Sequence, residues 1–156
     1  KIGIMPNHIF RKGDLAIISR SGTLTYEVVQ ALSSAGLGQN FVLGLGGDRL
    51  LGTDMREAVE MVLEKEPSGV VMIGEIGGQM EEEASSLIRD LGSENIFAYV
   101  AGVSAPPSKR MGHAGAIVSR GSGGAWEKIK ALEGSGVTVG RSLGDLVGLI
   151  SKRAIE

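Results

Sequence analysis

Short apolar runs alternate with helical patterns along this chain, and that alternation restricts the fold more than any other feature of the sequence. The runs contain no charged residue, which is typical of strands covered on both faces of a sheet. Strands separated by single helices pair in parallel, so the pattern predicts an α/β domain with a doubly wound, mostly parallel sheet and helices on both faces. We expect strands at Leu15–Ile18, Phe41–Leu45, Val70–Ile73, Ile96–Val100, Ala116–Val118 and Val137–Val139.

Helical patterns separate or follow these strands. Apolar side chains recur three and four residues apart, and most of the patterns end at glycine or proline. Ser21 and Ser142 are well placed as N-caps of the first and last helices, and Asp54 with Glu57 has the spacing of a capping box. The length suits a single core, so we expect one domain over residues 1–156.

The composition excludes several classes of function. The chain is 42% hydrophobic and 22% charged, and only 4% of its residues are aromatic. A formal net charge of −2 with so few aromatic side chains argues against binding to nucleic acid or to a membrane surface. No apolar run approaches the roughly 18 residues of a membrane span. The absence of cysteine excludes disulfides and fits a reducing compartment. We expect a cytoplasmic protein, or a mitochondrial-matrix protein in a eukaryote.

The loops that follow the predicted strands are rich in glycine. In an open parallel sheet such loops meet at the carboxyl edge, where ligands bind. They cover Ser19–Thr23, Gly44–Asp48, Gly74–Gly78 and Gly102–Gly115. Chemically active side chains are therefore expected at this edge.

The last of these loops carries His113, one of two histidines in the chain. Small residues flank it on both sides and leave the imidazole accessible to a close ligand. Lys109 and Arg110 precede it, either to neutralise a phosphate or a partner's acidic loop, or as ordinary solvated charges. A histidine in this setting acts as a nucleophile, a general base or a ligand, or simply fills a loop.

An acid and a helix start share the edge with His113. Glu75 ends an apolar strand between glycines, where a carboxylate needs a partner. It is able to hold an imidazole by its N–H, or else caps a loop or the next helix. Asp48 is a second candidate acid, better explained as a turn residue. Ser21, Gly22 and Thr23 open a helix directly after a buried strand, which is either an anion site or a plain N-cap.

Three consecutive glutamates, Glu81, Glu82 and Glu83, begin the third helix, where carboxylates favour the helix dipole. We interpret them as a solvated helix start and not as a metal site. Two histidines and no cysteine supply too few ligands for zinc, so no metal site is expected.

An imidazole, an acid and a helix N-terminus at one edge suit the carriage of a phosphoryl group. In that chemistry the imidazole attacks phosphorus, the acid holds the ring, and the helix start receives the charge. Two other interpretations stay open. The first is a non-catalytic flavodoxin-like module that binds an anion or a partner. The second is a flavodoxin-type cofactor binder, which the low aromatic content disfavours.

Four motifs in the chain closely resemble those of succinyl-CoA synthetase (succinate–CoA ligase) alpha subunits. They are Ala105–Ile117, Ser19–Glu27, Gly74–Gly78 and Gly46–Asp48, and they occur in the order and at the spacing of that family. The resemblance implies a flavodoxin-like, three-layer ligase domain equivalent to the carboxy-terminal half of such a subunit. The family's amino-terminal CoA-binding domain would then be absent, which fits a chain that begins at Lys1.

The resemblance also implies roles for individual residues. His113 would be phosphorylated, Glu75 would orient it, and Ser21, Gly22 and Thr23 would bind the phosphoryl group. The implied partners are a beta subunit, a small carboxylic acid and CoA. ATP or GTP with Mg²⁺ would be a substrate of the full complex, without any tightly bound cofactor. The isolated fragment is expected to be inactive.

Three positions depart from the family pattern. Arg49 stands where proline is usual, Asn7 where glycine is usual, and Ser122 where lysine is frequent. None of them belongs to the expected relay. The acid stays open between succinate and the acetate, malate or citrate used by related ligases.

Overall fold

The computed structural model describes residues 4–48, 50–106, 112–117 and 123–153. Lys109, Arg110, Arg49 and Ser122, which the sequence singled out, lie outside the described residues. The described part contains one parallel sheet in the order β2-β1-β3-β4-β5, the order of flavodoxin-like folds. Its strands are β1 (Lys12–Ser19), β2 (Gln39–Gly44), β3 (Gly69–Glu75), β4 (Ile96–Ala101) and β5 (Thr138–Gly140). The predicted α/β class and the parallel sheet are confirmed.

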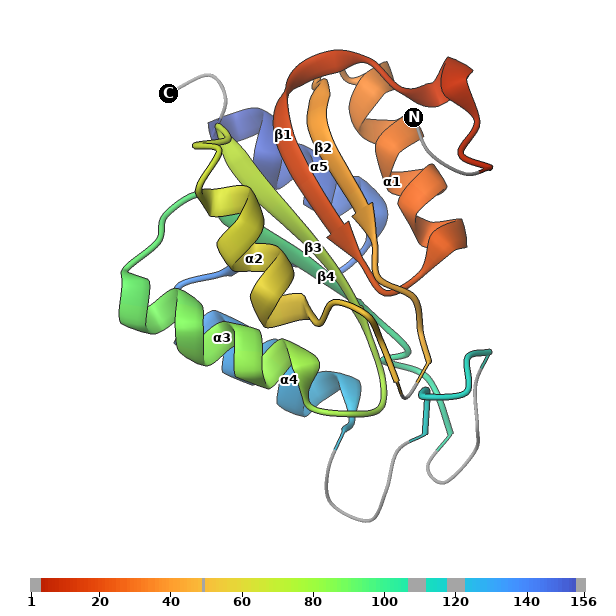
Figure 1. The fold of residues 1–156 in the computed structure, drawn as a ribbon, viewed down its shortest axis with the longest axis vertical. Helices are drawn as coiled ribbons and strands as arrows, with labels where there is room; N and C mark the ends of the chain where they lie inside the picture. The colour runs from red at the N-terminus through yellow and green to blue at the C-terminus, as the bar shows by residue number, and fades with distance from the viewer. Residues whose placement is uncertain (1–3, 49, 107–111, 118–122, 154–156) are drawn as a thin grey trace.

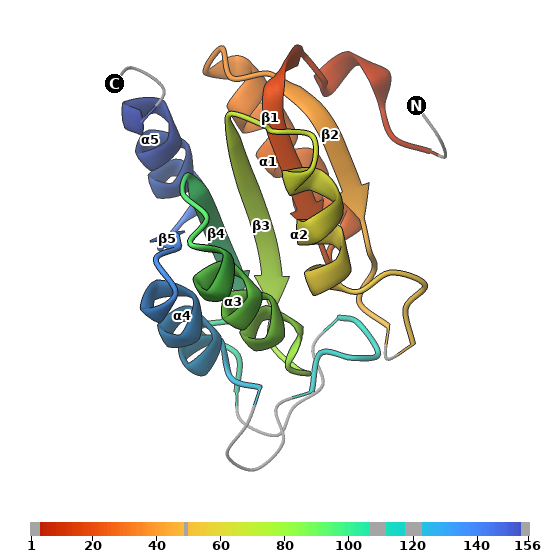
Figure 2. The same ribbon diagram turned by 60° about the vertical axis from the view of Figure 1, so that its left-hand side comes forward.

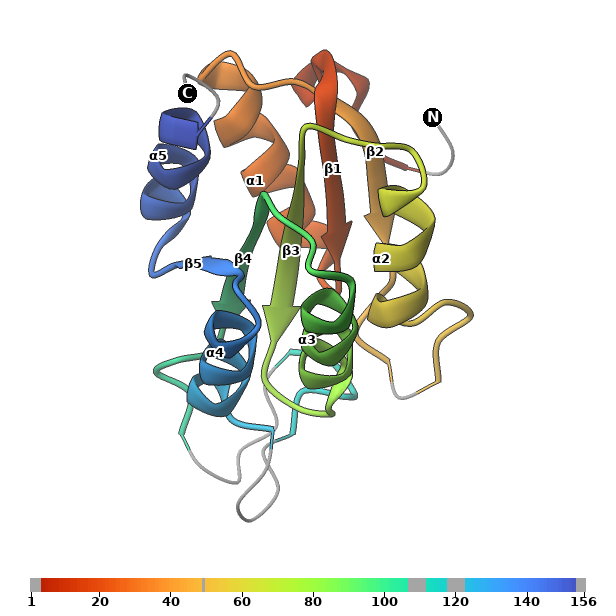
Figure 3. The same cartoon turned by 90° about the vertical axis from the view of Figure 1, so that its left-hand side faces the viewer.

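The helices cover both faces of the sheet (Figures 1 and 2). Helices α2, α3 and α4 pack on one face, and α1 and α5 pack on the other. Figure 3 shows α2, α3 and α4 in front of the strands and α1 behind them. The helices are α1 (Gly22–Ser34), α2 (Met55–Leu63), α3 (Met80–Leu91), α4 (Ala125–Gly134) and α5 (Leu143–Arg153), with a short 3₁₀ helix, η1 (Asn7–Ile9), before β1.

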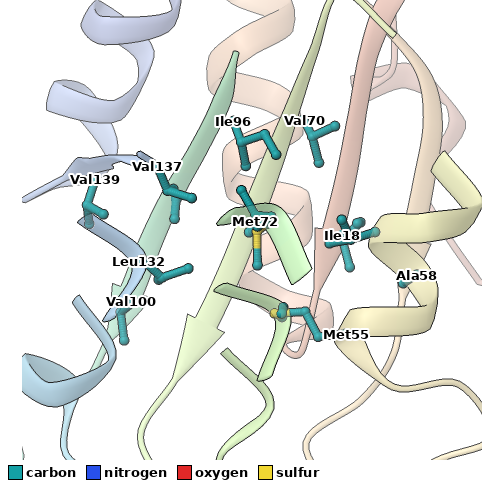
Figure 4. Close-up of a cluster of buried hydrophobic side chains, with 14 of the residues drawn as sticks. Ile18, Met55, Ala58, Val70, Met72, Ile96, Val100, Leu132, Val137 and Val139 are labelled. Atoms are coloured by element: carbon teal, nitrogen blue, oxygen red, sulfur yellow. The ribbon is translucent and has the colours of Figure 1, made fainter. Parts of the chain in front are cut away.

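The central part of the sheet is apolar because helices cover both of its faces. Every residue of β3 is buried, and neighbouring residues of β1 point to opposite layers: Ile18 packs toward α2 and α3, and Ile17 toward α1 and α5. Figure 4 shows the layer under α2, α3 and α4, where Met72 of β3 lies beside Ile18 of β1. Burial on both sides fixes the strands that carry the site.

The predicted helix starts are confirmed. Oγ of Ser21 accepts a hydrogen bond from the Leu24 amide at 3.3 Å, and Oγ of Ser142 accepts one from the Asp145 amide at 3.1 Å. Asp54 and the residue three positions on form the expected capping box at the start of α2. The first turns of α1 and α5 are thus held by side chains that the sequence identifies.

The strand predicted at Ala116–Val118 is wrong where the structure describes it. Ala116 and Ile117 lie in a loop, in which the Ala116 amide donates to the carbonyl of His113 at 3.1 Å and the Ile117 amide to that of Gly115 at 2.9 Å. These local turns occupy amides that a strand would offer to its neighbour. Val118 lies outside the described residues.

All four glycine-rich loops leave the carboxyl ends of their strands, as expected. In Figure 3 the strand arrows point toward the end of the molecule where residues 112–117 lie. The chain order reverses between β1 and β3, which makes the crevice at their ends the switch point of the sheet. Among the described residues, no helix has the length and apolarity needed to cross a membrane.

Candidate functional site

His113 and Glu75 form a direct pair at the carboxyl end of β3. Nδ1 of His113 lies 2.7 Å from Oε2 of Glu75. The Glu75 side chain is 10% exposed, whereas that of His113 is 39% exposed. A carboxylate oxygen accepts, so Nδ1 carries the proton and donates it to Glu75. In the neutral imidazole, Nε2 is then the ring nitrogen without a proton.

The His113 imidazole packs directly against the backbone of Gly47. A Cβ added to Gly47 would overlap Nδ1 and Cγ of His113. The Gly115 amide donates to the carbonyl of Gly47 at 2.9 Å, which ties the histidine loop to the loop after β2. Gly77 adopts a φ of +90°, and a Cβ there would overlap the carbonyl of Gly115. Glycine at these two positions lets the loop approach Glu75 closely.

Arg20, the residue directly after β1, reaches under the loop to Glu75. Its side chain is 1% exposed, and Nη2 lies 3.6 Å from Oε1 of Glu75. Nη1 donates to the carbonyls of Glu75 at 3.1 Å and Gly77 at 2.9 Å, and to Oε1 of Glu81 at 2.9 Å. One guanidinium thus joins the ends of β1 and β3 to the start of α3.

Glu81 is buried, which corrects the expectation that all three glutamates are solvated. Its side chain is 1% exposed and accepts from Arg20, from the Glu75 amide at 3.0 Å and from Nζ of Lys128 at 2.6 Å. Glu83 is exposed as expected, and Glu82, partly exposed, accepts from Nζ of Lys128 at 2.9 Å. A buried carboxylate needs charged partners, and Arg20 and Lys128 supply them.

The helix start predicted to bind phosphate follows β1, the strand that pairs with β3, and Glu75 is the last residue of β3. Ser19 of β1 pairs with Ile73 of β3, so Ser21 and Glu75 each lie two residues beyond a register pair. Ser21 is buried, whereas Gly22 and Thr23 are exposed. In the described part of the chain, no hydrogen bond joins Ser21 to His113. Asp48 is exposed in the bend after β2, and the acid that reaches His113 is Glu75.

The sequence interpretation missed Arg20, Glu81 and Lys128. Arg20 carried a usable signal, because a lone cation after an apolar strand needs a partner for the same reason as Glu75. Lys128 and Glu81 carried none, since a charged residue within a helix looks like an ordinary surface residue until the packing is known.

A cleft of about 620 Å³ opens beside the histidine loop. Asp48, Asp54, Met80, Gly115 and Ile117 are among the residues that line it. Its volume is in the range of small-ligand pockets. A larger hollow of about 1160 Å³ follows the edge strand β2. His113 is not among the lining residues of either hollow. Within the described residues, no three metal-binding side chains converge.

Succinate–CoA ligase alpha subunits match this chain in sequence over most of its length. It is 49% identical over 152 residues to the succinate–CoA ligase [ADP-forming] subunit alpha 2 of Archaeoglobus fulgidus, covering 97% of this chain and 53% of that protein. It is 51% identical over 140 residues to the corresponding alpha subunit of Aquifex aeolicus, covering 89% of this chain and 46% of that protein. The chain thus spans about half the length of these relatives.

Solved structures share the fold. An ATP citrate lyase from Methanothrix soehngenii, in complex with citrate and coenzyme A, superposes with a TM-score of 0.84 at 25% identity, covering 92% of this chain and 24% of that one. A dinucleotide-forming acetyl-coenzyme A synthetase from Ca. Korarchaeum cryptofilum gives 0.65 at 19% identity, covering 90% and 30%. Residues 18–138 match the CoA-ligase family. The chain therefore belongs to the CoA-ligase family.

Proposed function

We propose that this chain is the phosphohistidine domain of an acyl-CoA synthetase alpha subunit, and that His113 relays a phosphoryl group from a nucleoside triphosphate to a carboxylic acid. The observation that carries the proposal is the 2.7 Å contact between Nδ1 of His113 and Oε2 of Glu75. With the proton on Nδ1, Nε2 is the proposed nucleophile. The partial exposure of the imidazole leaves Nε2 room to meet a donor.

The proposed reaction has three balanced steps. Nε2 attacks the γ-phosphorus, the bond to the β-phosphate oxygen breaks, and the nucleoside diphosphate leaves. The charge that develops on the ring is stabilised by the Glu75 carboxylate. A carboxylate oxygen of the substrate then attacks phosphorus, the N–P bond breaks, and an acyl phosphate forms. Finally the CoA thiol attacks the acyl carbon, and phosphate leaves with the thiol proton.

The start of α1 is the proposed cradle for the phosphoryl group. Gly22 and Thr23 are exposed at the first turn of a 13-residue helix, at the strand end beside Glu75. Free amides and the positive end of the helix dipole favour an anion there. A beta subunit would bring the nucleotide with Mg²⁺, and the exposed side of His113 is where it would approach.

Succinate is the proposed acid, with CoA as the acyl acceptor. The support is the 49–51% identity to two succinate–CoA ligase alpha subunits. Citrate is the second candidate, because the citrate lyase superposes with a TM-score of 0.84. Acetate and malate complete the assay panel. We place the reaction in the cytoplasm, or in the mitochondrial matrix of a eukaryote, as a cysteine-free chain would suit.

The test is uptake of labelled phosphate by the protein purified with its nucleotide-binding partner. With Mg²⁺ and γ-labelled ATP or GTP, the chain should acquire phosphate that is labile in acid and stable in base. Alkaline hydrolysis should yield the Nε2 isomer of phosphohistidine, because Nδ1 is held by Glu75.

Two variants separate the histidines. His113→Gln should take up no label, whereas His8→Gln, the same change at an exposed position in η1, should label like the wild type. Label that persists in His113→Gln, or phosphate on Nδ1, would contradict the proposal.

A further inference from the structure

We propose that Arg20 is a positioning residue for the Glu75–His113 pair. Its buried guanidinium holds the Glu75 carboxylate as an anion directed at Nδ1 of His113, which keeps the proton on Nδ1 and leaves Nε2 free. The inference rests on the proposed function, since it says what prepares His113 to receive the phosphoryl group.

The first support is that the two carboxylate oxygens of Glu75 face different partners. Oε2 meets His113, whereas Oε1 is buried and accepts no hydrogen bond from any described residue. The group facing Oε1 is Nη2 of Arg20, at 3.6 Å. A buried carboxylate without a cation would be costly to keep charged. Arg20 supplies that cation without competing for the oxygen that holds the imidazole.

The second support is that Arg20 and Glu81 form hydrogen bonds with the backbone of Glu75. Nη1 of Arg20 donates to the carbonyls of Glu75 and Gly77, one on either side of Ile76. The Glu75 amide donates to Oε1 of Glu81, which itself accepts from Arg20. The strand end that carries Glu75 is therefore fixed through both its carbonyl and its amide. A planar guanidinium is suited to this because it presents several donors in fixed directions.

A purely structural role makes a different prediction. In that case Arg20 would only anchor α3 through Glu81, as Lys128 anchors α4 to the same carboxylate. Lys128 contacts Glu81, Glu82 and the Gly78 carbonyl, and makes no hydrogen bond to Glu75 or His113 among the described residues. Lys128→Met is thus a matched control, because it removes a cation from Glu81 and leaves the Glu75 contacts in place.

The test reads the ring nitrogens of His113 directly. The chain is labelled with ¹⁵N-histidine, and two-bond spectra correlate the ring nitrogens with the ring C–H protons. His8 serves as an internal reference, and His113→Gln assigns the signals. Wild type, Arg20→Lys, Glu75→Gln and Lys128→Met are compared well below the lowest of their melting temperatures, so that every variant is measured in its folded state.

Arg20→Lys should draw the Nδ1 and Nε2 signals of His113 toward each other, because a lysine cannot make the same set of contacts and the two tautomers mix. Glu75→Gln should do the same. Lys128→Met should lower the melting temperature and leave the His113 signals at their wild-type positions. Signals that stay unchanged in Arg20→Lys, or that move equally in Lys128→Met, would overturn the proposal.

A kinetic arm uses the complex with the nucleotide-binding partner. Arg20→Lys should slow phosphorylation of His113 about 10- to 100-fold, by analogy with the loss of an outer partner that orients a metal-bound histidine. In a Glu75→Gln background the same change should add less than about twofold, because Arg20 acts through Glu75. Fully additive effects would contradict that route. If the wild type never labels, the proposed function fails, while the nitrogen signals still decide the role of Arg20.

Discussion

At the scale of single residues, the contact between Gly47 and the imidazole is the most sensitive part of the site. Gly47 has no positive φ, so its backbone tolerates alanine, but the new Cβ would occupy the space of His113 Nδ1. Gly47→Ala should therefore push the ring away from Glu75. We expect phosphorylation to slow at least tenfold, or about 1.4 kcal/mol of transition-state free energy, measured as the initial rate of label uptake.

Gly44→Ala is the matched control for this change. Gly44 is the last residue of β2, three positions before Gly47, and an added Cβ there has open space around it. It should label at the wild-type rate. Equal rates for Gly47→Ala and Gly44→Ala would show that the docked ring is not the reactive one.

Glu75 was predictable from the sequence at this scale, and Glu81 was not. Glu75 stands out because it ends an apolar strand between glycines, where a carboxylate needs a partner. Glu81 shares its local sequence with Glu82 and Glu83, and only the packing of α3 onto the end of β3 turns it inward. Its partners lie 61 and 47 residues away in the chain, and no local pattern encodes separations of that size.

At the scale of elements, the start of α1 contributes to the stability of the fold and is also the proposed binding site for the phosphoryl group. Oγ of Ser21 caps the helix by accepting from the Leu24 amide. Ser21→Ala should destabilise the fold by about 1 kcal/mol, the typical cost of a lost N-cap, as measured by denaturant unfolding. It should also slow phosphoryl transfer, because frayed first-turn amides bind an anion less well.

Ser142→Ala separates the two effects. Ser142 caps α5 with the same geometry but is not part of the proposed cradle. It should cost a similar free energy of unfolding and leave label uptake unchanged. A loss of uptake shared by both cap variants would assign the effect to general stability instead.

The elements themselves were largely predictable because strand burial and helix capping are local signals. The structure extends most strands by one to a few residues, as for β1, which begins at Lys12 and not at Leu15. Local pattern failed at Ala116 and Ile117, where apolar residues serve a loop packed on glycines. Ala116 is buried there all the same, so its apolar character reports burial and not a strand.

At the scale of the whole molecule, the strand order assembles the site. Placing β1 beside β3 brings Arg20, Ser21 and Glu75 to one crevice, and the loop after β4 returns to that crevice with His113. Residues from three parts of the chain thus meet at the switch point. The sequence predicted the edge at which they meet, but not the cluster of buried charges beneath it.

The proposed relay makes His113 a transient carrier of the phosphoryl group, and a chase experiment follows the label as it leaves the histidine. The labelled complex is freed of nucleotide and divided between ADP, succinate with CoA, and buffer alone. We expect ADP to recover the label as ATP, and succinate with CoA to release it as inorganic phosphate, both at least as fast as steady-state turnover. Label that stays on His113, or that leaves equally fast in buffer, would contradict the relay.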